Sequence, residues 1–313
     1  MQFWAWWAEH AADPHETLIE ELSAQVTAIH PGLQWEIGPG ATARHVLCLS
    51  GAGDPTLRAV AERWAQSAPT ADETWEFTPT RRPDANALTM RLTIDKWDFD
   101  LSKTVVSIRL DEASMWVDVD VHHPLFDSVP GAVRKQIATL VVAWALGEDG
   151  RARWVDRIGV AVRRPEDALP VEALPETVAA LAERQTENNW AILRGETESG
   201  APVMAVAMRP MRWVDHPSFD RHLSVDLSFR GVLDDPKLMS LRALEDEIVA
   251  ALAGNRVLMV GHETVKGRRT LHFYCDSTDE GPADIIRRWV RGRWGRKLRV
   301  DFDPGWTAVE HLR

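Results

Sequence analysis

The stretch from Met115 to Phe126, MWVDVDVHHPLF, constrains the fold of this chain more than any other. Apolar residues alternate with Trp, Asp and His from position 115 to 122. A period of two predicts a β-strand with one buried face and one polar face. Because only short gaps separate this strand from predicted strands at 87–95 and 104–110, we expect the three to form an antiparallel meander.

The composition bounds the class of protein. With 313 residues the chain is long enough for two domains and a proper core. Its net charge of −11 disfavours non-specific binding of nucleic acid by the whole surface. The chain has 15 Trp against a single Tyr, and Trp usually keeps one edge near a polar partner. We expect many of these side chains to be structural and regard several as candidates for lining a groove.

The cysteines and the apolar runs predict a cellular location. Cys48 and Cys275 fall in separate predicted strands, which favours two buried thiols in a reducing compartment. The N-terminal MQFWAWWAEH has no basic region, and its apolar run is too short for a signal peptide. The longest apolar run, residues 137–146, is too short to span a bilayer. These features predict a cytoplasmic protein with no membrane partner.

The C-terminal third has the most legible element order. It reads as strand, helix, strand, strand, helix and strand, the β-α-β-β-α-β order of a ferredoxin-like fold. Two helices in this order cover one face of an antiparallel sheet. The predicted elements are 223–230, 237–253, 256–263, 269–275, 282–291 and 298–302.

The N-terminal region has a similar order and spacing of elements, with α-β-β-α-β elements starting at about residues 17, 33, 44, 54 and 74. An ancient duplication and independent convergence both explain the match. We therefore predict an α+β protein with ferredoxin-like elements at both ends. Its domains are residues 1–164, with a strand-rich insert at about 85–125, and residues 190–313, joined by a helix-bearing linker at 165–189.

The C-terminal domain carries motifs of a known family. They are the Thr-x-x-Gly-Arg turn at Thr264, the strand ending Phe273-Tyr274, and the closing Asp303-Pro304-x-Trp306. With these motifs, residues 190–313 resemble the bacterial domain-of-unknown-function family 695. The resemblance implies a bacterial protein and supplies no activity, cofactor or catalytic residue.

The polar face of the 115–122 strand is the first candidate site. Asp118, Asp120 and His122 alternate along it, and side chains two residues apart on a strand lie about 7 Å apart. Asp120 and His122 are therefore a feasible metal-binding pair, whose third ligand would come from Asp95, Asp98 or Asp100. His123 points to the opposite, buried face. The alternative is a solvated polar strand with a satisfied core histidine.

Two further stretches combine reactive or charged residues. His216-Pro-Ser-Phe-Asp-Arg-His222 contains Ser, His and Asp, but no strand-turn-helix elbow surrounds Ser218, which favours a structural turn over a nucleophile. Residues 285–300 hold seven basic residues and no acid. This run forms a candidate basic interaction surface that is a solvated face, a docking site for an acidic protein surface, or a phosphate-binding patch. Its main residues are Arg287, Arg288, Arg291 and Trp294.

Together these patterns favour a non-catalytic binding or regulatory module that contacts a protein or a small ligand through a tryptophan-bearing sheet face. No cofactor is expected, nucleic acid is a disfavoured partner, and the free sheet edges allow a homodimer. The alternative is a metal-assisted hydrolase that uses Asp118, Asp120 and His122.

Overall fold

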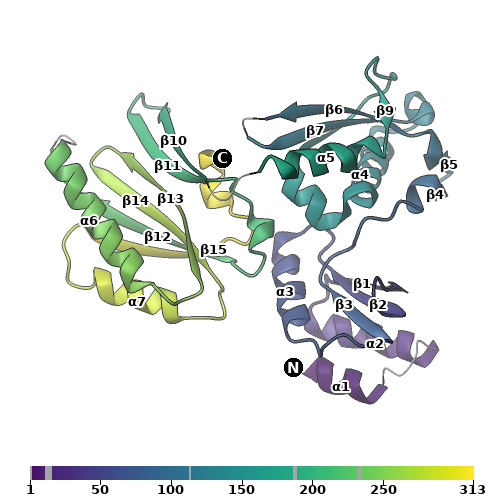
Figure 1. Ribbon diagram of the computed structural model, residues 1–313, viewed down its shortest axis with the longest axis horizontal. Helices are drawn as coiled ribbons and strands as arrows, with labels where there is room; N and C mark the ends of the chain where they lie inside the picture. The colour runs from purple at the N-terminus through teal and green to yellow at the C-terminus, as the bar shows by residue number, and fades with distance from the viewer. Residues whose placement is uncertain (1, 11–15, 113, 186–188, 232–233) are drawn as a thin grey trace. The chain divides into compact units, whose positions relative to one another are not determined.

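The computed structural model describes residues 2–10, 16–112, 114–185, 189–231 and 234–313. The chain is a mixed α+β protein with several antiparallel sheets, and it divides into two compact units, residues 1–186 and 187–313 (Figure 1). No helix in the described ranges has the length and apolar character needed to cross a membrane. Each unit is described by itself below.

Residues 2–10 and 16–78 of the first unit form a sheet of three strands with helices packed on it (Figure 1). The elements are α1 (Gln2–His10), α2 (Glu16–Ile29), β1 (Gln34–Pro39), β2 (His45–Ser50), α3 (Pro55–Gln66) and β3 (Trp75–Thr78). β1 pairs antiparallel with β2, and β2 pairs parallel with β3. α3 begins where the sequence predicts, because the Asp54 carboxylate accepts the Thr56 N–H at 2.8 Å.

The rest of the first unit contains a second sheet, in the order β8-β7-β6-β9. β6 and β7 pair antiparallel as predicted, and β8 adds to β7 in parallel. The elements are β4 (Arg91–Ile94), β5 (Trp97–Asp100), β6 (Val105–Asp111), β7 (Trp116–His122), α4 (Gly131–Trp154), β8 (Val155–Val160), β9 (Leu169–Pro170) and α5 (Ala173–Glu183).

The predicted three-stranded meander is wrong in its first member. Residues 87–89 form a 3-10 turn, and β4 pairs only with β5 in a separate two-stranded hairpin. Asp95, with a φ of 55°, starts the two-residue connection between Ile94 and Trp97. That tight turn brings β5 back against β4, so the backbone groups along their facing edges bond to each other within the hairpin.

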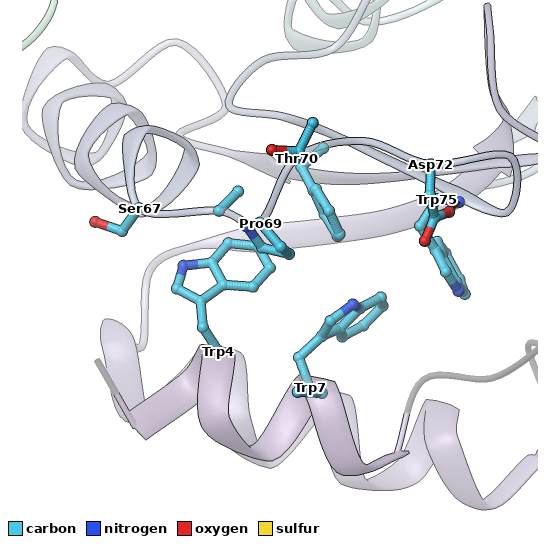
Figure 2. A pocket seen from close by; sticks show the side chains of 10 residues that line it. Trp4, Trp7, Ser67, Pro69, Thr70, Asp72 and Trp75 are labelled. Carbon is cyan, nitrogen blue, oxygen red and sulfur yellow. Dashed lines mark hydrogen bonds between the residues drawn. The ribbon is translucent and has the colours of Figure 1, made fainter.

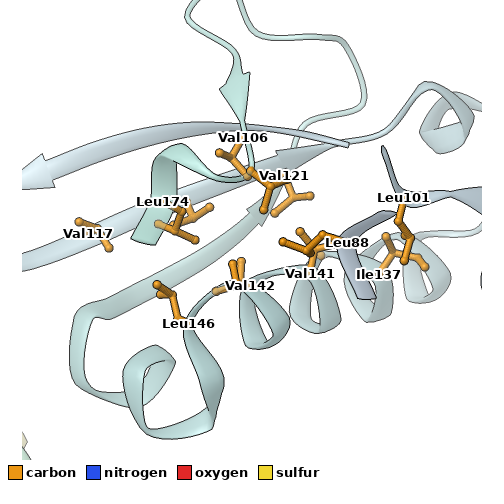
Figure 3. Close-up of a cluster of buried hydrophobic side chains, with 14 of the residues drawn as sticks. Leu88, Leu101, Val106, Val117, Val121, Ile137, Val141, Val142, Leu146 and Leu174 are labelled. Carbon is orange, nitrogen blue, oxygen red and sulfur yellow. The ribbon is translucent and has the colours of Figure 1, made fainter. Parts of the chain in front are cut away.

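The valines of β7 face the core, as the alternation predicts. Val117, Val119 and Val121 are fully buried, and they pack with residues of α4 and α5 (Figure 3). Ile137, Val141 and Leu174 are among the helix residues that close this core over the sheet (Figure 3). Burying each such aliphatic side chain contributes roughly 1.5–3 kcal/mol.

α4 is broken at Gly147. Gly147 has a φ of 72° and a ψ of 171°, after which helical backbone resumes as far as Trp154. The break turns Glu148 toward the first sheet, where its carboxylate accepts the Ser50 hydroxyl at 2.7 Å. Arg81 also contacts the Glu148 carboxylate at 3.2 Å. These bonds join α4 to the sheet that carries β2.

The second unit is a six-stranded antiparallel sheet in the order β10-β11-β13-β14-β12-β15 (Figure 1). Helices α6 and α7 cover one face, where they pack on the apolar residues of β12 and β14. The last turn, Thr307–Leu312, packs with Trp306 on residues of the opposite face. The elements are β10 (Asn189–Glu196), β11 (Pro202–Arg209), β12 (Arg221–Ser228), α6 (Asp235–Ala251), β13 (Val257–Val265), β14 (Arg268–Cys275), α7 (Gly281–Val290) and β15 (Arg296–Phe302).

The break in α4 gives a first prediction. In a Gly147→Ala variant the new Cβ would lie 2.9 Å from the Arg81 carbonyl oxygen, on a backbone that disfavours L side chains. We expect the free energy of unfolding to fall by about 2 kcal/mol, measured by urea denaturation. Gly131→Ala is the control, because a Cβ there meets no atom within 4 Å. Equal stability of the two variants would contradict this role of Gly147.

Candidate functional site

An aromatic contact attaches α1 to the first sheet. Trp4 and Trp7 lie close to each other on α1, as the rise and turn of a helix require for residues three apart. The Trp4 ring stacks on Trp64 of α3 with centroids 4.9 Å apart, and its indole N–H donates to the Trp64 carbonyl at 3.2 Å. Trp7 meets Trp75 of β3 edge to face, also at 4.9 Å. The first turns of the chain are thereby tied to both α3 and β3.

These side chains wall a cavity of about 450 Å³ between α1, β3 and the segment that joins α3 to β3 (Figure 2). The volume falls in the range of about 300–1,000 Å³ that is typical of small-molecule pockets. Figure 2 shows Trp4 and Trp7 rising from α1 toward Pro69, Thr70 and Trp75. The cavity, called the Trp pocket below, is lined by Trp4, Trp7, Ala8, Ser67, Ala68, Pro69, Thr70, Asp72, Trp75 and Phe77.

The indoles of Trp4 and Trp7 differ in their hydrogen bonds. No described residue accepts a hydrogen bond from the Trp7 indole N–H. This nitrogen is not among the fully buried polar atoms without a partner, so it stays accessible although the whole side chain is only 4% exposed. The indole of Trp4, by contrast, is satisfied by the Trp64 carbonyl. Trp7 therefore offers a guest in the pocket a specific point for a hydrogen bond.

Asp72 supplies the charge of the Trp pocket. Its Oδ1 accepts the backbone N–H groups of Thr74 and Trp75, each at 2.7 Å. These bonds hold the pKa of the Asp72 carboxyl below its usual range, because they favour the charged form. The second oxygen, Oδ2, contacts no described residue. The other described residues of the lining are aromatic, small or hydroxyl-bearing, and such groups are suited to binding a ligand.

The polar residues of β7 are brought together by an arginine. Arg157 of β8 contacts Asp120 at 3.0 Å and Asp118 at 3.4 Å. Arg109 of β6 adds contacts of 3.4 and 3.5 Å to the same two carboxylates. The strand pairing causes this arrangement, since β6 and β8 flank β7 and place basic residues beside the acids. The carboxylates thus form a cross-strand ion-pair cluster.

The two histidines after this cluster are held by backbone groups. His122 is buried, and its Nδ1 lies 2.9 Å from the Ala161 carbonyl oxygen. His123 is also buried: its Nε2 lies 3.0 Å from the Asp100 carbonyl oxygen, and its Nδ1 accepts the Leu125 N–H at 3.1 Å. Burial lowers the pKa of His123. His123 is the satisfied core histidine that the strand alternation allows.

The described residues contain no group of three or more His, Cys, Asp or Glu side chains placed to hold a metal ion. The predicted third ligands lie on the β4–β5 hairpin and have other contacts, since Asp98 lies 3.3 Å from Arg91 and Asp100 lies 3.3 Å from Lys103. The structure therefore joins Asp118 and Asp120 through Arg157 and Arg109, and it directs His122 to the Ala161 carbonyl instead of to these carboxylates.

The basic interaction surface is partly neutralised by its own surroundings. Arg287 lies 2.7 Å from Asp284, and Arg296 stacks over Trp289 with its guanidinium 3.8 Å from the ring centroid. Arg288 and Arg291 are exposed and form no ion pair with a described residue. Trp294 is 71% exposed, with the Arg230 guanidinium 5.0 Å from its ring centroid. A cationic surface with one exposed indole remains around the end of α7.

The 216–222 stretch forms a buried turn that leads into β12. Asp220 accepts the backbone N–H of Ser277 at 2.8 Å, and His216 stacks on Trp306. His222 continues into a chain of polar contacts on the face opposite α6 and α7: its Nε2 lies 3.0 Å from His272 Nδ1. His272 in turn lies 3.6 Å from Glu263. The structural interpretation of this stretch agrees with these contacts.

Comparisons with known proteins assign no family to this chain. A scan against protein-family models matches no family, and a search of curated proteins finds no relative. The resemblance of residues 190–313 to family 695 therefore stays a prediction.

Sequence reasoning missed the Trp pocket. Its signal is the FWAWW run at the start of the chain, which places aromatic residues at helical spacing. The excess of tryptophan pointed to a groove, but the pairing of α1 with the segment before β3 depends on contacts about 60 residues apart, such as Trp4 with Trp64. Neither periodicity nor composition reports such a contact.

The buried His222 gives a second prediction. Burial, followed by the nearby His272, lowers its pKa to about 4 from an ordinary 6.5. Between pH 6.5 and 4, His222 binds a proton in the unfolded chain but not in the folded chain. The contribution of neutral His222 to the free energy of unfolding is therefore complete above pH 6.5 and is lost as the pH falls toward 4. The loss should reach roughly 3 kcal/mol, measured by urea denaturation across this range.

A His222→Phe variant keeps a ring against Tyr274 and should lose this part of the pH dependence. The exposed His10 gives the control, and His10→Gln should retain the wild-type slope. An unchanged slope in His222→Phe would contradict the assignment.

Proposed function

We propose that this chain is a non-catalytic binding module that takes a compact apolar group of a small ligand or a partner protein into the Trp pocket. The observation that carries the proposal is the cavity of about 450 Å³ that Trp4, Trp7 and Trp75 wall and that Asp72 also lines. A guest that fills the cavity removes aromatic surface from water, which contributes about 25 cal/mol per Å². A guest that also carries an acceptor satisfies Trp7.

The hydrolase hypothesis gains no comparable support. Its carboxylates, Asp118 and Asp120, contact Arg157, and His122 contacts the Ala161 carbonyl. A guanidinium between two carboxylates takes the place that a metal ion would need. The binding proposal requires no rearrangement of this kind.

We also infer that the second unit is a ferredoxin-like domain of a bacterial cytoplasmic protein. The support is the order β13-β14-β12-β15, with antiparallel neighbours and both helices on one face, within the larger sheet. The motifs shared with family 695 lie in this unit. A reducing compartment fits Cys48 and Cys275, which are buried free thiols whose pKa is raised by burial to about 12.

Direct observation of the Trp7 indole tests the proposed function. We expect 3,3-dimethylbutan-1-ol or choline, two compact probes with a hydroxyl, to shift the indole N–H signal of Trp7 in a ¹H–¹⁵N correlation spectrum. The shift has a physical cause, because the hydroxyl oxygen of the probe accepts a hydrogen bond from this N–H, or the probe alters the magnetic environment of the ring. Trp7→Phe identifies the signal by removing it.

Trp294→Phe is the matched control, since Trp294 is exposed in the second unit, outside the pocket. The Trp294 indole signal should stay in place while that of Trp7 moves. If neither probe moves the Trp7 signal, or if both indoles move together, the Trp pocket is not a binding site.

A further inference from the structure

The charge in the lining of the Trp pocket is negative. Among the described residues, Asp72 is the only charged one in the lining, and its Oδ2 has no described partner. The carboxylate is fixed in place by the N–H groups of Thr74 and Trp75, so its position does not depend on a guest. The part of the lining that the structure describes holds no lysine or arginine to neutralise it. A cation that enters therefore meets a preformed counter-charge.

The aromatic walls favour the same guest. Trp4 and Trp7 lie at 78° to each other with centroids 6.5 Å apart, and Trp7 and Trp75 also lie at 78°. The rings contact one another edge to face and therefore present differently oriented surfaces along the lining, where Figure 2 shows Trp4, Trp7 and Trp75. The π-system of tryptophan attracts a cation within about 6 Å of its centroid more strongly than that of Tyr or Phe.

We propose that the Trp pocket selects an alkylated ammonium group, held by the rings of Trp4, Trp7 and Trp75 and by the carboxylate of Asp72. This inference rests on the proposed function and names the chemical class of its ligand. Alkyl groups on the nitrogen match the apolar walls, and they spread the charge so that less hydration is lost on entry. An anion is excluded by Asp72 and by the negative faces of the rings.

Trp7 adds a second point of contact. No described residue accepts a hydrogen bond from its indole N–H, so an oxygen acceptor near the cationic group of the guest can do so. Amino alcohols of the choline type supply this oxygen as free molecules. An alkylated lysine side chain supplies it through a backbone carbonyl. Both present the same chemistry to the pocket.

The test compares choline with its neutral isostere, 3,3-dimethylbutan-1-ol, at constant ionic strength. Both are titrated to roughly 50 mM into the full chain, and the Trp7 indole signal reports binding. We expect choline to bind about tenfold more tightly than the isostere. Acetyl-trimethyl-lysine methylamide forms a third arm, and the tighter of the two cations identifies the source as a free ammonium compound or a modified lysine.

Asp72→Asn removes the charge but keeps the Oδ1 acceptor for Thr74 and Trp75. This variant should lose most of the preference for choline and bind the isostere as the wild type does. Glu73→Gln, an exposed neighbour outside the lining, removes the same charge and should change neither affinity.

The outcomes separate the two proposals. Equal binding of choline and the isostere, or an unchanged preference in Asp72→Asn, overturns the selectivity for ammonium and leaves the pocket as an apolar binding site. Absence of binding by all three probes overturns the proposed function as well.

Discussion

The docking of α1 on α3 and β3 is the contact on which the candidate site depends. Trp4 stacks on Trp64 and donates to its carbonyl, and Trp7 packs against Trp75. Phe3 adds a buried contact to Trp64 at 5.7 Å. These aromatic contacts replace what a longer helix would gain from its own hydrogen bonds, because a helix of nine residues is not stable alone. Without them the Trp pocket would lose two of its three tryptophan walls.

Ion pairs and hydrogen bonds elsewhere in the first unit fix the elements on which α1 docks. Glu148 and Asp149, just past the break in α4, bind Ser50 of β2 and Arg58 of α3. The Arg58–Asp149 pair is bidentate, with both nitrogen–oxygen distances at 2.9 Å. Such geometry fixes orientation as well as distance. The sheet and the helix on which α1 docks are therefore both bound by the segment just past the break in α4.

Much of this fold was predictable because it is local. The alternation in β7, the Asp54 cap of α3 and the element order of the second unit follow from residue periods and turn chemistry. The pairing of β4 with β5 was not predicted, because the Asp95 turn decides it and the spacing of the strands does not. The site divides in the same way: the cluster of Asp118 and Asp120 is visible in sequence, but the flanking Arg157 is placed by strand pairing.

The central claim is that the aromatic cavity against α1 is a place for a cationic guest. The most direct measurement is a crystal structure of the full chain grown with saturating choline. The account predicts density for the ammonium group within about 6 Å of the ring centroids of Trp4, Trp7 and Trp75, with its hydroxyl on the Trp7 N–H. An empty Trp pocket, or choline bound only elsewhere on the protein, would contradict it.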